Sequence, residues 1–231
     1  MAYPSPRARS LESPALLLHT ATEFARRGYA VLLPLRRGFG ATGGELAEDA
    51  GTCANADYRS AERAAAADVL AAYAFARRLP YVDGSRIILA GQSAGGVAAL
   101  YSAAQSPPGL VAVLAFAAGR GADFNLGGVP CAAARLGEVF EEVGRKLRVP
   151  ALVYYAQNDL FFGPVATRAW FERLKAGGAR AEYVLQPPFG SNGHYVFTHS
   201  AGVGQWLPVV ERFLTRYGVP FDAHEAVAPP I

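Results

Sequence analysis

A serine flanked by glycines constrains this chain more than any other feature. In the stretch Arg86-Ile-Ile-Leu-Ala-Gly-Gln-Ser-Ala-Gly-Gly-Val-Ala-Ala-Leu100, a short apolar run leads directly into Gly91-Gln-Ser-Ala-Gly95 and then into small residues. The run Ile87–Ala90 is too short for a helix and β-branched at its start, which predicts a strand buried on both faces. Glycines two residues either side of Ser93 are typical of a strand that turns sharply into a helix, where neighbouring backbone leaves no room for a Cβ atom.

Such a turn would hold Ser93 in a strained conformation with its hydroxyl clear of the sheet. The following helix would direct backbone N–H groups and the positive end of its dipole toward that hydroxyl, so an oxyanion formed there would be stabilised. The pattern therefore predicts a nucleophile elbow, with the Ala94 N–H as an oxyanion donor. The alternative is a glycine-rich strand-to-helix turn without chemistry.

Composition limits the remaining possibilities. With 231 residues, 52% of them hydrophobic, the chain is long enough for one well-filled core, and we expect one domain over 1–231 with irregular tails at 1–10 and 218–231. The net charge of +3 forms no basic stripe interleaved with aromatic residues, which argues against a nucleic-acid partner. No apolar run reaches the length of a membrane span, and 1–10 lacks the apolar segment of a secretory signal, so the chain as written reads as cytoplasmic.

Strand and helix patterns alternate along the whole chain. Apolar runs predict strands at 29–35, 87–90, 110–116, 150–156 and 181–185, and periodic patterns predict helices at 14–27, 59–78, 135–147, 164–175 and about 200–216. This alternation indicates the α/β class, with a mostly parallel sheet of about five strands and helices on both faces. In such a sheet, functional groups gather at the carboxyl ends of the strands.

One loop admits a different interpretation. Gly38-Phe-Gly-Ala-Thr-Gly43 matches the dinucleotide fingerprint G-x-G-x-x-G and follows a predicted strand, which makes a nicotinamide- or flavin-binding protein a rival. The fingerprint requires a helix directly after it, because the helix N-terminus receives the pyrophosphate. Residues 45–57 lack helical periodicity, so we expect instead a glycine-rich loop that lines the same crevice as Ser93.

Two polar residues follow the last predicted strands. Asp159 comes after the strand at 150–156, and His194 lies in Gly190-Ser-Asn-Gly-His-Tyr195 after the strand at 181–185. Each alone has an ordinary structural explanation, as a turn residue or an exposed histidine. Together with Ser93 they occur in the order serine, acid, histidine that this type of elbow demands. Asp123 also lies beyond a strand and competes for the role of the acid, whereas His19 falls within a helix and is expected to be structural.

The three residue types suit nucleophilic catalysis. A serine hydroxyl is a poor nucleophile near neutral pH, so a neutral imidazole must take its proton during attack and return it to the leaving group. His194 would do both, and the Asp159 carboxylate would fix its tautomer and stabilise the imidazolium. We therefore predict a catalytic triad of Ser93, Asp159 and His194.

At these motifs the chain resembles the α/β-hydrolases, and within them the dienelactone-hydrolase-like group of bacterial enzymes. The resemblance covers nearly the whole chain and rests on Gly28-Tyr-Ala-Val31, Arg37-Gly-Phe-Gly40, Tyr81-Val-Asp83, Gly91-Gln-Ser-Ala-Gly-Gly96, Asn158-Asp-Leu-Phe-Phe-Gly-Pro164 and Asn192-Gly-His194. It implies hydrolysis of carboxylic esters by the triad above. Dienelactone hydrolases use cysteine as nucleophile, so serine at position 93 indicates a general carboxylesterase.

At its N-terminus, this sequence differs from the family pattern. Family members place a strand ending in His-Gly before the first helix, and the loop after that strand donates the second oxyanion N–H. Residues 1–10 leave no room for it, so we expect the N-terminal strands to be missing from this sequence. Losing one oxyanion donor costs on the order of a hundred- to a thousandfold in rate, and a sheet edge without its neighbour is prone to association.

Cys53 and Cys131 are the only cysteines, and each lies in a predicted loop near the crevice. They form either one disulfide or two free thiols, and a disulfide would point to a periplasmic or secreted protein whose export signal lies upstream. No spacing of metal-ligating residues predicts a metal, and no cofactor is expected. The sequence thus predicts a serine esterase acting on small or medium acyl substrates through an acyl-enzyme. The alternative is an inactive truncated hydrolase or a small-ligand-binding module.

Overall fold

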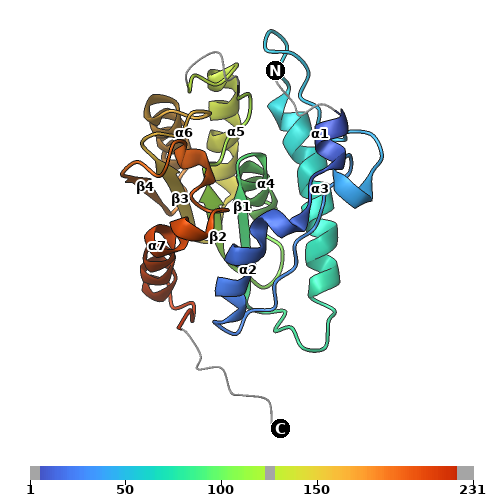
Figure 1. Cartoon of the computed structure of the whole chain (residues 1–231), viewed down its shortest axis with the longest axis vertical. Coiled ribbons are helices and arrows are strands. Elements are labelled where there is room, and N and C mark those ends of the chain that lie inside the picture. Colours follow the sequence, from blue (N-terminus) through green and yellow to red (C-terminus); the bar gives the residue numbers. More distant parts are fainter. Residues whose placement is uncertain (1–5, 123–127, 223–231) are drawn as a thin grey trace.

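The computed structural model describes residues 6–122 and 128–222. Within them, four parallel strands form one sheet in the order β1 (Ile87–Gln92), β2 (Leu110–Phe116), β3 (Ala151–Ala156) and β4 (Ala181–Gln186) (Figure 1). Ala115 on β2 lies opposite Gly91 on β1 and opposite Val153 on β3, and the β1–β2 register shifts once, between Ile87 and Ile88. All four strands were expected from their apolar runs, and parallel pairing brings their carboxyl ends to one edge.

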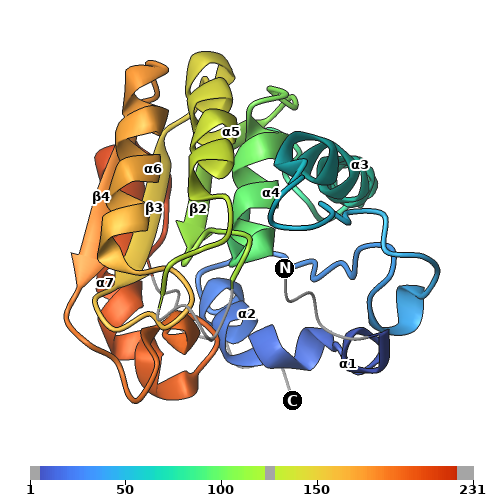
Figure 2. The same cartoon turned by 90° about the horizontal axis from the view of Figure 1, so that it is seen from above.

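Helices cover both faces of this sheet (Figures 1 and 2). One layer contains α3 (Tyr58–Ala76), α4 (Ala94–Ala103), α5 (Ala133–Lys146) and α6 (Pro164–Ala176). The opposite face is covered by α2 (Leu18–Ala25) and α7 (Val203–Arg216). Short elements complete the chain: α1 (Pro6–Ser10), η1 (Pro14–Leu17), η2 (Gly40–Thr42), η4 (Gly193–Tyr195) and η5 (Ser200–Gly202).

Side chains of the central strands alternate between two hydrophobic clusters. On β2, Val113 and Ala115 pack toward α3–α6, whereas Leu114 and Phe116 pack toward α2 and α7. All four side chains are fully buried. A strand that is apolar on both faces is what a parallel sheet between two helical layers requires, so the continuous apolar runs of the sequence are explained.

The expected strand at 29–35 is the main error of the sequence-based interpretation. The segment pairs with no strand, and the sheet of the described chain has four strands rather than about five. Val31 and Leu32 are 41% and 44% exposed, although the apolar run predicted burial on both faces. A strand needs a neighbour about 4.7–4.9 Å away to receive its hydrogen bonds. Here a cavity lies between this segment and β1, so the apolar pattern is present without the ladder.

The helix expected at 14–27 is also shorter and less regular than predicted. Ser13 caps its start as expected, because the Ser13 Oγ accepts a hydrogen bond from the Ala15 N–H at 3.2 Å. The first turn is the 3₁₀ helix η1, and α2 then ends at Ala25. The final helix expected at about 200–216 likewise begins with a 3₁₀ turn before α7. Helix ends often tighten in this way, and sequence periodicity does not register it.

Two further features concern the segment before β1. The glycine loop at 38–43 leads into the short η2, and no α-helix of the described chain begins between it and α3, so the helix that a dinucleotide fingerprint needs is not there. Cys53 in the loop before α3 forms a disulfide with Cys131, with Cα atoms 5.4 Å apart. Separately, no described helix is long and apolar enough to cross a membrane.

Candidate active site

Ser93 occupies the turn between β1 and α4. Its backbone has φ 56° and ψ −128°, a conformation that a residue with a side chain rarely adopts. The turn is tight because a Cβ atom at Gly91 would lie 2.2 Å from the carbonyl oxygen of Gly95. Glycine at position 91 is therefore a steric requirement of the elbow, as the sequence pattern indicated.

The backbone around Ser93 is held on two sides. Its N–H donates to the Phe116 carbonyl at 2.9 Å, and its carbonyl accepts from the Gly119 N–H at 3.2 Å. Ala94 is the first residue of α4, where backbone N–H groups have no acceptor within the helix. The Ala94 N–H and the positive end of the helix dipole are thus positioned beside the serine to bind an anion.

Asp159 and His194 come together from the loops after β3 and β4. The Asp159 Oδ2 lies 3.0 Å from the His194 Nδ1, and both residues are buried. The other carboxylate oxygen, Oδ1, accepts hydrogen bonds from the N–H groups of Phe161 and Phe162 at 2.8 and 3.0 Å. With Oδ1 occupied by the backbone, Oδ2 is left to orient the imidazole.

Two asparagines fasten these loops to each other. The Asn158 Oδ1 accepts from the Phe189 N–H at 2.9 Å, and the Asn192 Oδ1 accepts from the N–H groups of Leu160 and His194 at 3.1 and 3.0 Å. Each loop therefore carries an asparagine that binds the backbone of the other loop, and the geometry of the Asp159–His194 pair depends on both.

Close packing completes the support of His194. A Cβ atom at the preceding Gly193 would approach the Ala156 Cβ and the Asn158 Oδ1 to 2.5 Å, so this loop passes too close to β3 for any other residue. The Phe161 ring lies 4.3 Å from the imidazole, centre to centre, and the Gln92 side-chain amide donates to the His194 carbonyl. The imidazole is thus fixed in direction and partly shielded from water.

A cavity of about 1290 Å³ connects these residues. Ser93 and His194 both line it, and from them it extends along the outer edge of β1 as far as the unpaired segment at 29–35. No described strand pairs with that edge of β1. Several of the exposed large hydrophobic side chains of the molecule lie in this cavity, namely Leu16, Val31, Leu32, Phe75, Tyr81 and Tyr195. The candidate site is therefore open and apolar on the β1 side.

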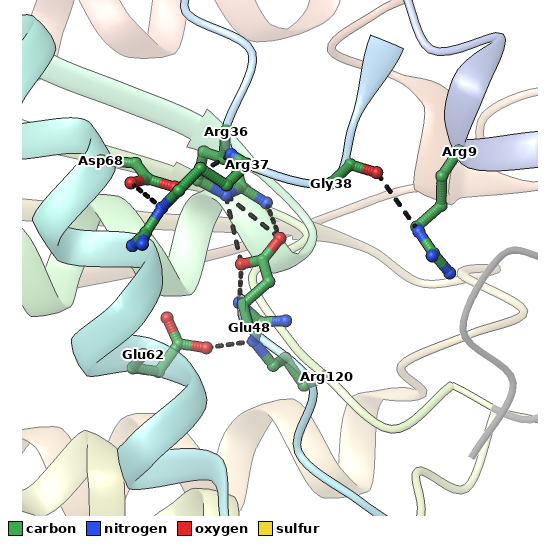
Figure 3. A network of polar contacts seen from close by, with 8 residues as sticks. All are labelled: Arg9, Arg36, Arg37, Gly38, Glu48, Glu62, Asp68 and Arg120. Carbon is green, nitrogen blue, oxygen red and sulfur yellow. Dashed lines mark hydrogen bonds and ion pairs between the residues drawn. The ribbon is translucent and has the colours of Figure 1, made fainter. Parts of the chain in front are cut away.

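Arg36 and Arg120 line another part of the cavity and belong to a network of buried charges (Figure 3). Arg36 binds Glu48 through Nη2 at 2.7 Å and Nε at 3.2 Å, and the Nη2 of Arg120 binds the other Glu48 oxygen at 2.5 Å. The Nε of Arg120 in turn binds Glu62 on α3. The side chains of Arg120, Glu48 and Glu62 are almost wholly buried.

The pKa values of the two carboxylates of this network shift in opposite directions. Burial opposes ionisation of Glu48, but the charges of Arg120 and Arg36 outweigh it and lower the pKa of Glu48 below its usual value. Complete burial raises the pKa of Glu62, and Arg120 only partly offsets this effect. The Glu62 Oε2 has no hydrogen-bond partner among the described residues.

The structure describes all the site residues predicted from sequence except Asp123. Ser93, Ala94 and His194 line one cavity, and Asp159 lies 3.0 Å from His194. The contact between the second His194 nitrogen and the Ser93 hydroxyl stays a prediction. Asp123 lies outside the described residues. In the described ranges, no three His, Cys, Asp or Glu side chains gather as a metal site would require.

Sequence reasoning missed the residues that hold the site together: Arg36, Glu48, Gln92, Asn158 and Asn192. Asn158 directly precedes Asp159, and Asn192 is separated from His194 only by Gly193. Asparagine in such loops is typical of turns in which the side chain binds the backbone. That signal was available. The pairing of Arg36 with Glu48 and of Glu48 with Arg120 joins distant segments and has no local pattern.

Comparisons with known proteins agree with this architecture. The profile of the alpha/beta hydrolase family matches residues 8–224. No curated protein matches the chain in sequence. Among solved structures, an esterase from Pyrococcus furiosus is similar with a TM-score of 0.59 and 14% identity, over 87% of this chain and 74% of that protein.

Two more solved structures are similar at comparable levels. Acetyl xylan esterase 1 from Thermoanaerobacterium matches with a TM-score of 0.55 and 16% identity, over 90% of this chain and 71% of its own. A Klebsiella pneumoniae protein assigned as a dienelactone hydrolase matches with a TM-score of 0.51 and 17% identity, over 76% of this chain and 74% of its own. At these identities the similarity establishes a shared fold.

Proposed function

Because the chain belongs to the alpha/beta hydrolase family, we propose that it is a serine hydrolase that cleaves carboxylic esters through an acyl-enzyme, with Ser93 as nucleophile. The observation that carries the proposal is the buried Asp159–His194 pair, whose two side chains lie 3.0 Å apart and whose imidazole lines the same cavity as the strained serine. A structural histidine would need neither a buried carboxylate on one ring nitrogen nor an opening to a cavity beside a nucleophile elbow.

Acylation begins with proton transfer. With Nδ1–H held by the Asp159 carboxylate, the imidazole is fixed in the tautomer whose Nε2 is unprotonated and can accept the Ser93 proton. The serine oxygen then attacks the ester carbonyl, and the negative charge on the carbonyl oxygen is met by the Ala94 N–H. His194 returns the proton to the departing alcohol, and the acyl group remains on Ser93.

Deacylation repeats these steps with water as nucleophile. His194 takes a proton from the water as it attacks the acyl-enzyme, and then returns it to Ser93 as the carboxylic acid leaves. Asp159 stays ionised throughout and stabilises the imidazolium in both half-reactions. Ser93, His194 and water account for every bond and proton transfer in the two half-reactions, so this scheme uses no cofactor.

The cavity and the related structures support an ester of small or medium size. Its volume of about 1290 Å³ is larger than the roughly 300–1,000 Å³ of ordinary small-molecule pockets, so an ester of this size has room to bind. The apolar wall along β1 suits an acyl chain. Two proteins of the same fold, from Pyrococcus furiosus and Thermoanaerobacterium, carry esterase in their names. We therefore place carboxylic esters before amides as the substrate class.

Labelling with a fluorophosphonate probe tests the proposal. We expect the probe to modify Ser93, and Ser93→Ala to abolish both labelling and hydrolysis of p-nitrophenyl acetate. Ser60→Ala is the matched control, because Ser60 lies exposed on α3, away from the cavity. If Ser93→Ala still reacted with the probe, the nucleophile assignment would be wrong. A protein that binds the acetate ester without labelling or turnover would instead be a binding module or an inactive hydrolase.

A further inference from the structure

The guanidinium of Arg36 presents one unused nitrogen to the candidate site. Its Nε and Nη2 both bind Glu48, at 3.2 and 2.7 Å, so the fork that these two nitrogens form is directed at the carboxylate (Figure 3). The remaining nitrogen, Nη1, then points away from Glu48 because the group is planar. No hydrogen bond from Nη1 to another described residue is present, although the side chain is 82% buried and lines the cavity.

Nη1 is directed at the first turn of α4. It lies 3.6 Å from the point where a Cβ atom on Gly95 would stand, and Gly95 is two residues beyond Ser93. Glycine at this position leaves the space between the guanidinium and the helix N-terminus open. The unused N–H groups of Arg36 therefore lie beside the first turn of α4, and Arg36, Ser93 and Ala94 line the same cavity. A tetrahedral oxyanion of an acyl transfer would form at this turn.

The position of Arg36 is held rigidly. Glu48 is fixed from its other side by Arg120, and Glu48 and Arg120 are both almost wholly buried. The guanidinium also lies over the Phe39 ring, 5.4 Å from its centre. A donor fixed in advance stabilises developing charge without the cost of reorganisation during the reaction, which is the property that an oxyanion donor needs.

Neither of the neighbouring arginines offers the same group. Arg37 turns the other way and binds Asp68 on α3, with its Nε 2.7 Å from the carboxylate, and it is half exposed. Arg120 lies deeper, where its Nε and Nη2 are used by Glu62 and Glu48. Arg36 alone among these three combines a nitrogen without a described partner with a place beside α4.

We propose that the Arg36 guanidinium is the second oxyanion donor of this site, and that with the Ala94 N–H it binds the tetrahedral oxyanion through Nη1. The inference rests on the proposed function and extends it. A side chain on the loop after the segment at 29–35 thus supplies a charged donor beside the backbone N–H of Ala94.

Kinetics of Arg36→Ala test the inference with p-nitrophenyl acetate, a neutral ester. We expect kcat to fall by about a hundred- to a thousandfold, the usual effect of losing one oxyanion donor, while KM changes by less than about threefold. Arg37→Ala is the matched control, because it removes the adjacent arginine of the same loop, and it should keep kcat within about twofold. A kcat for Arg36→Ala equal to that of the Arg37→Ala control would overturn the inference.

Two further measurements separate catalysis from a purely structural role. Adding guanidinium ion at low millimolar concentration to Arg36→Ala should restore part of kcat, whereas a folding defect would not respond. Should Arg36→Ala fail to fold, Arg36→Lys keeps the charge but cannot hold Glu48 with two nitrogens while presenting a third. We expect it to fold with a Tm near that of the parent and to lose at least about tenfold in kcat. Parent-like turnover by a folded Arg36→Lys variant would overturn the inference.

A second ester distinguishes the oxyanion from an anionic substrate group. Mono-p-nitrophenyl succinate carries a free carboxylate, and if Arg36 served to bind that carboxylate, Arg36→Ala would raise KM for this ester alone and spare the acetate. That outcome would overturn the inference and leave the proposed function standing. Fluorophosphonate labelling of the parent separates the proposed function from the role of Arg36. If Ser93 of the parent were not labelled, both would be overturned. If Ser93 were labelled but Arg36→Ala kept the turnover of the parent, only the role of Arg36 would be overturned.

Discussion

The β3–β4 end of the sheet and its β1 edge position their functional groups by different means. Around β3 and β4, hydrogen bonds to the backbone hold the functional side chains. Asp159 accepts hydrogen bonds from two N–H groups of its own loop, and Asn158 and Asn192 bind the backbone of the facing loop. Around β1, the sheet edge has no described neighbour, and the cavity wall combines exposed apolar side chains with two arginines of a buried charge network. The Asp159–His194 pair thus lies in a closed region, and the proposed oxyanion site lies in an open one.

This difference indicates which changes each region tolerates. A backbone-held loop passes its geometry directly to the residue it carries, so small changes there are expected to damage chemistry while leaving the fold intact. The open region depends on buried ion pairs and on a disulfide, since its apolar segment at 29–35 contributes no strand pairing. Apart from substitutions of Arg36, changes there should affect local stability more than turnover.

The largest effect is expected from Asp159→Asn in the closed region. Replacing the orienting carboxylate by an amide leaves the imidazole in the wrong tautomer, and kcat should fall by about 10⁴-fold with little change in Tm. Asp123→Asn is the control and should remain close to the parent. Steady-state kinetics with a p-nitrophenyl ester measure both. A large loss in Asp123→Asn with a mild one in Asp159→Asn would move the acid role to Asp123.

A pair of leucine truncations compares the packing of the two regions. Leu152 is fully buried on β3, whereas Leu32 is 44% exposed in the unpaired segment. Leu152→Ala should lower the free energy of unfolding by about 2–5 kcal/mol through lost contacts and the cavity left behind. Leu32→Ala should cost less than about 1 kcal/mol, since little apolar surface returns to water there. Equal losses in denaturant titrations would show that the segment at 29–35 is covered in solution.

The disulfide should stabilise the open region specifically. Cys53 and Cys131 are separated by 78 residues, and closing a loop of this length restricts the unfolded chain by about 4 kcal/mol in the chain-entropy description. Replacing both cysteines by serine should therefore lower the free energy of unfolding by about 2–4 kcal/mol. Hydrogen exchange would locate the effect, with faster exchange expected in the loop that carries Glu48. An equal increase over β3 and β4 would contradict the regional assignment.

The smallest effect concerns Asp83, in the turn before β1. Hydrogen bonds from the Ser85 hydroxyl and backbone N–H, and from Arg86, lower the pKa of this exposed carboxyl to about 2. Because the folded-state pKa is depressed, the small stabilisation it brings is present above the unfolded value near 3.8 and is lost as the pH falls through about 2. Ser85→Ala should move the carboxyl pKa back toward its ordinary value in an NMR titration. A pKa unchanged by this substitution would assign the shift to Arg86.

Local patterns predicted the parts of the molecule that depend on neighbours in the sequence. The four paired strands and the elbow at Ser93 follow from apolar runs and glycine spacing, because burial on both faces and close backbone approach leave local traces. The segment at 29–35 has the same apolar run and still forms no strand. Pairing depends on whether another strand lies beside it, and no pattern within the segment itself records that.

In the candidate site, too, some features were predictable from the sequence and others were not. Chain order placed Ser93, Asp159 and His194 at strand ends, since the topology of a parallel sheet brings successive strand ends to one edge. The contacts that hold these groups were not predictable. Arg36 meets Glu48 across 12 residues and Arg120 meets Glu48 across 72, so the network forms only when three separate segments have packed.

The backbone conformation of Ser93 has an evolutionary consequence. At φ 56° a serine carries roughly 1–3 kcal/mol of strain, whereas glycine adopts such angles freely. A lineage that no longer used the hydroxyl would gain stability from the single replacement Ser93→Gly, so mutation and drift would tend to remove the serine. Its presence at a position where the fold would be better served by glycine favours continued selection for chemistry over the history of an abandoned enzyme.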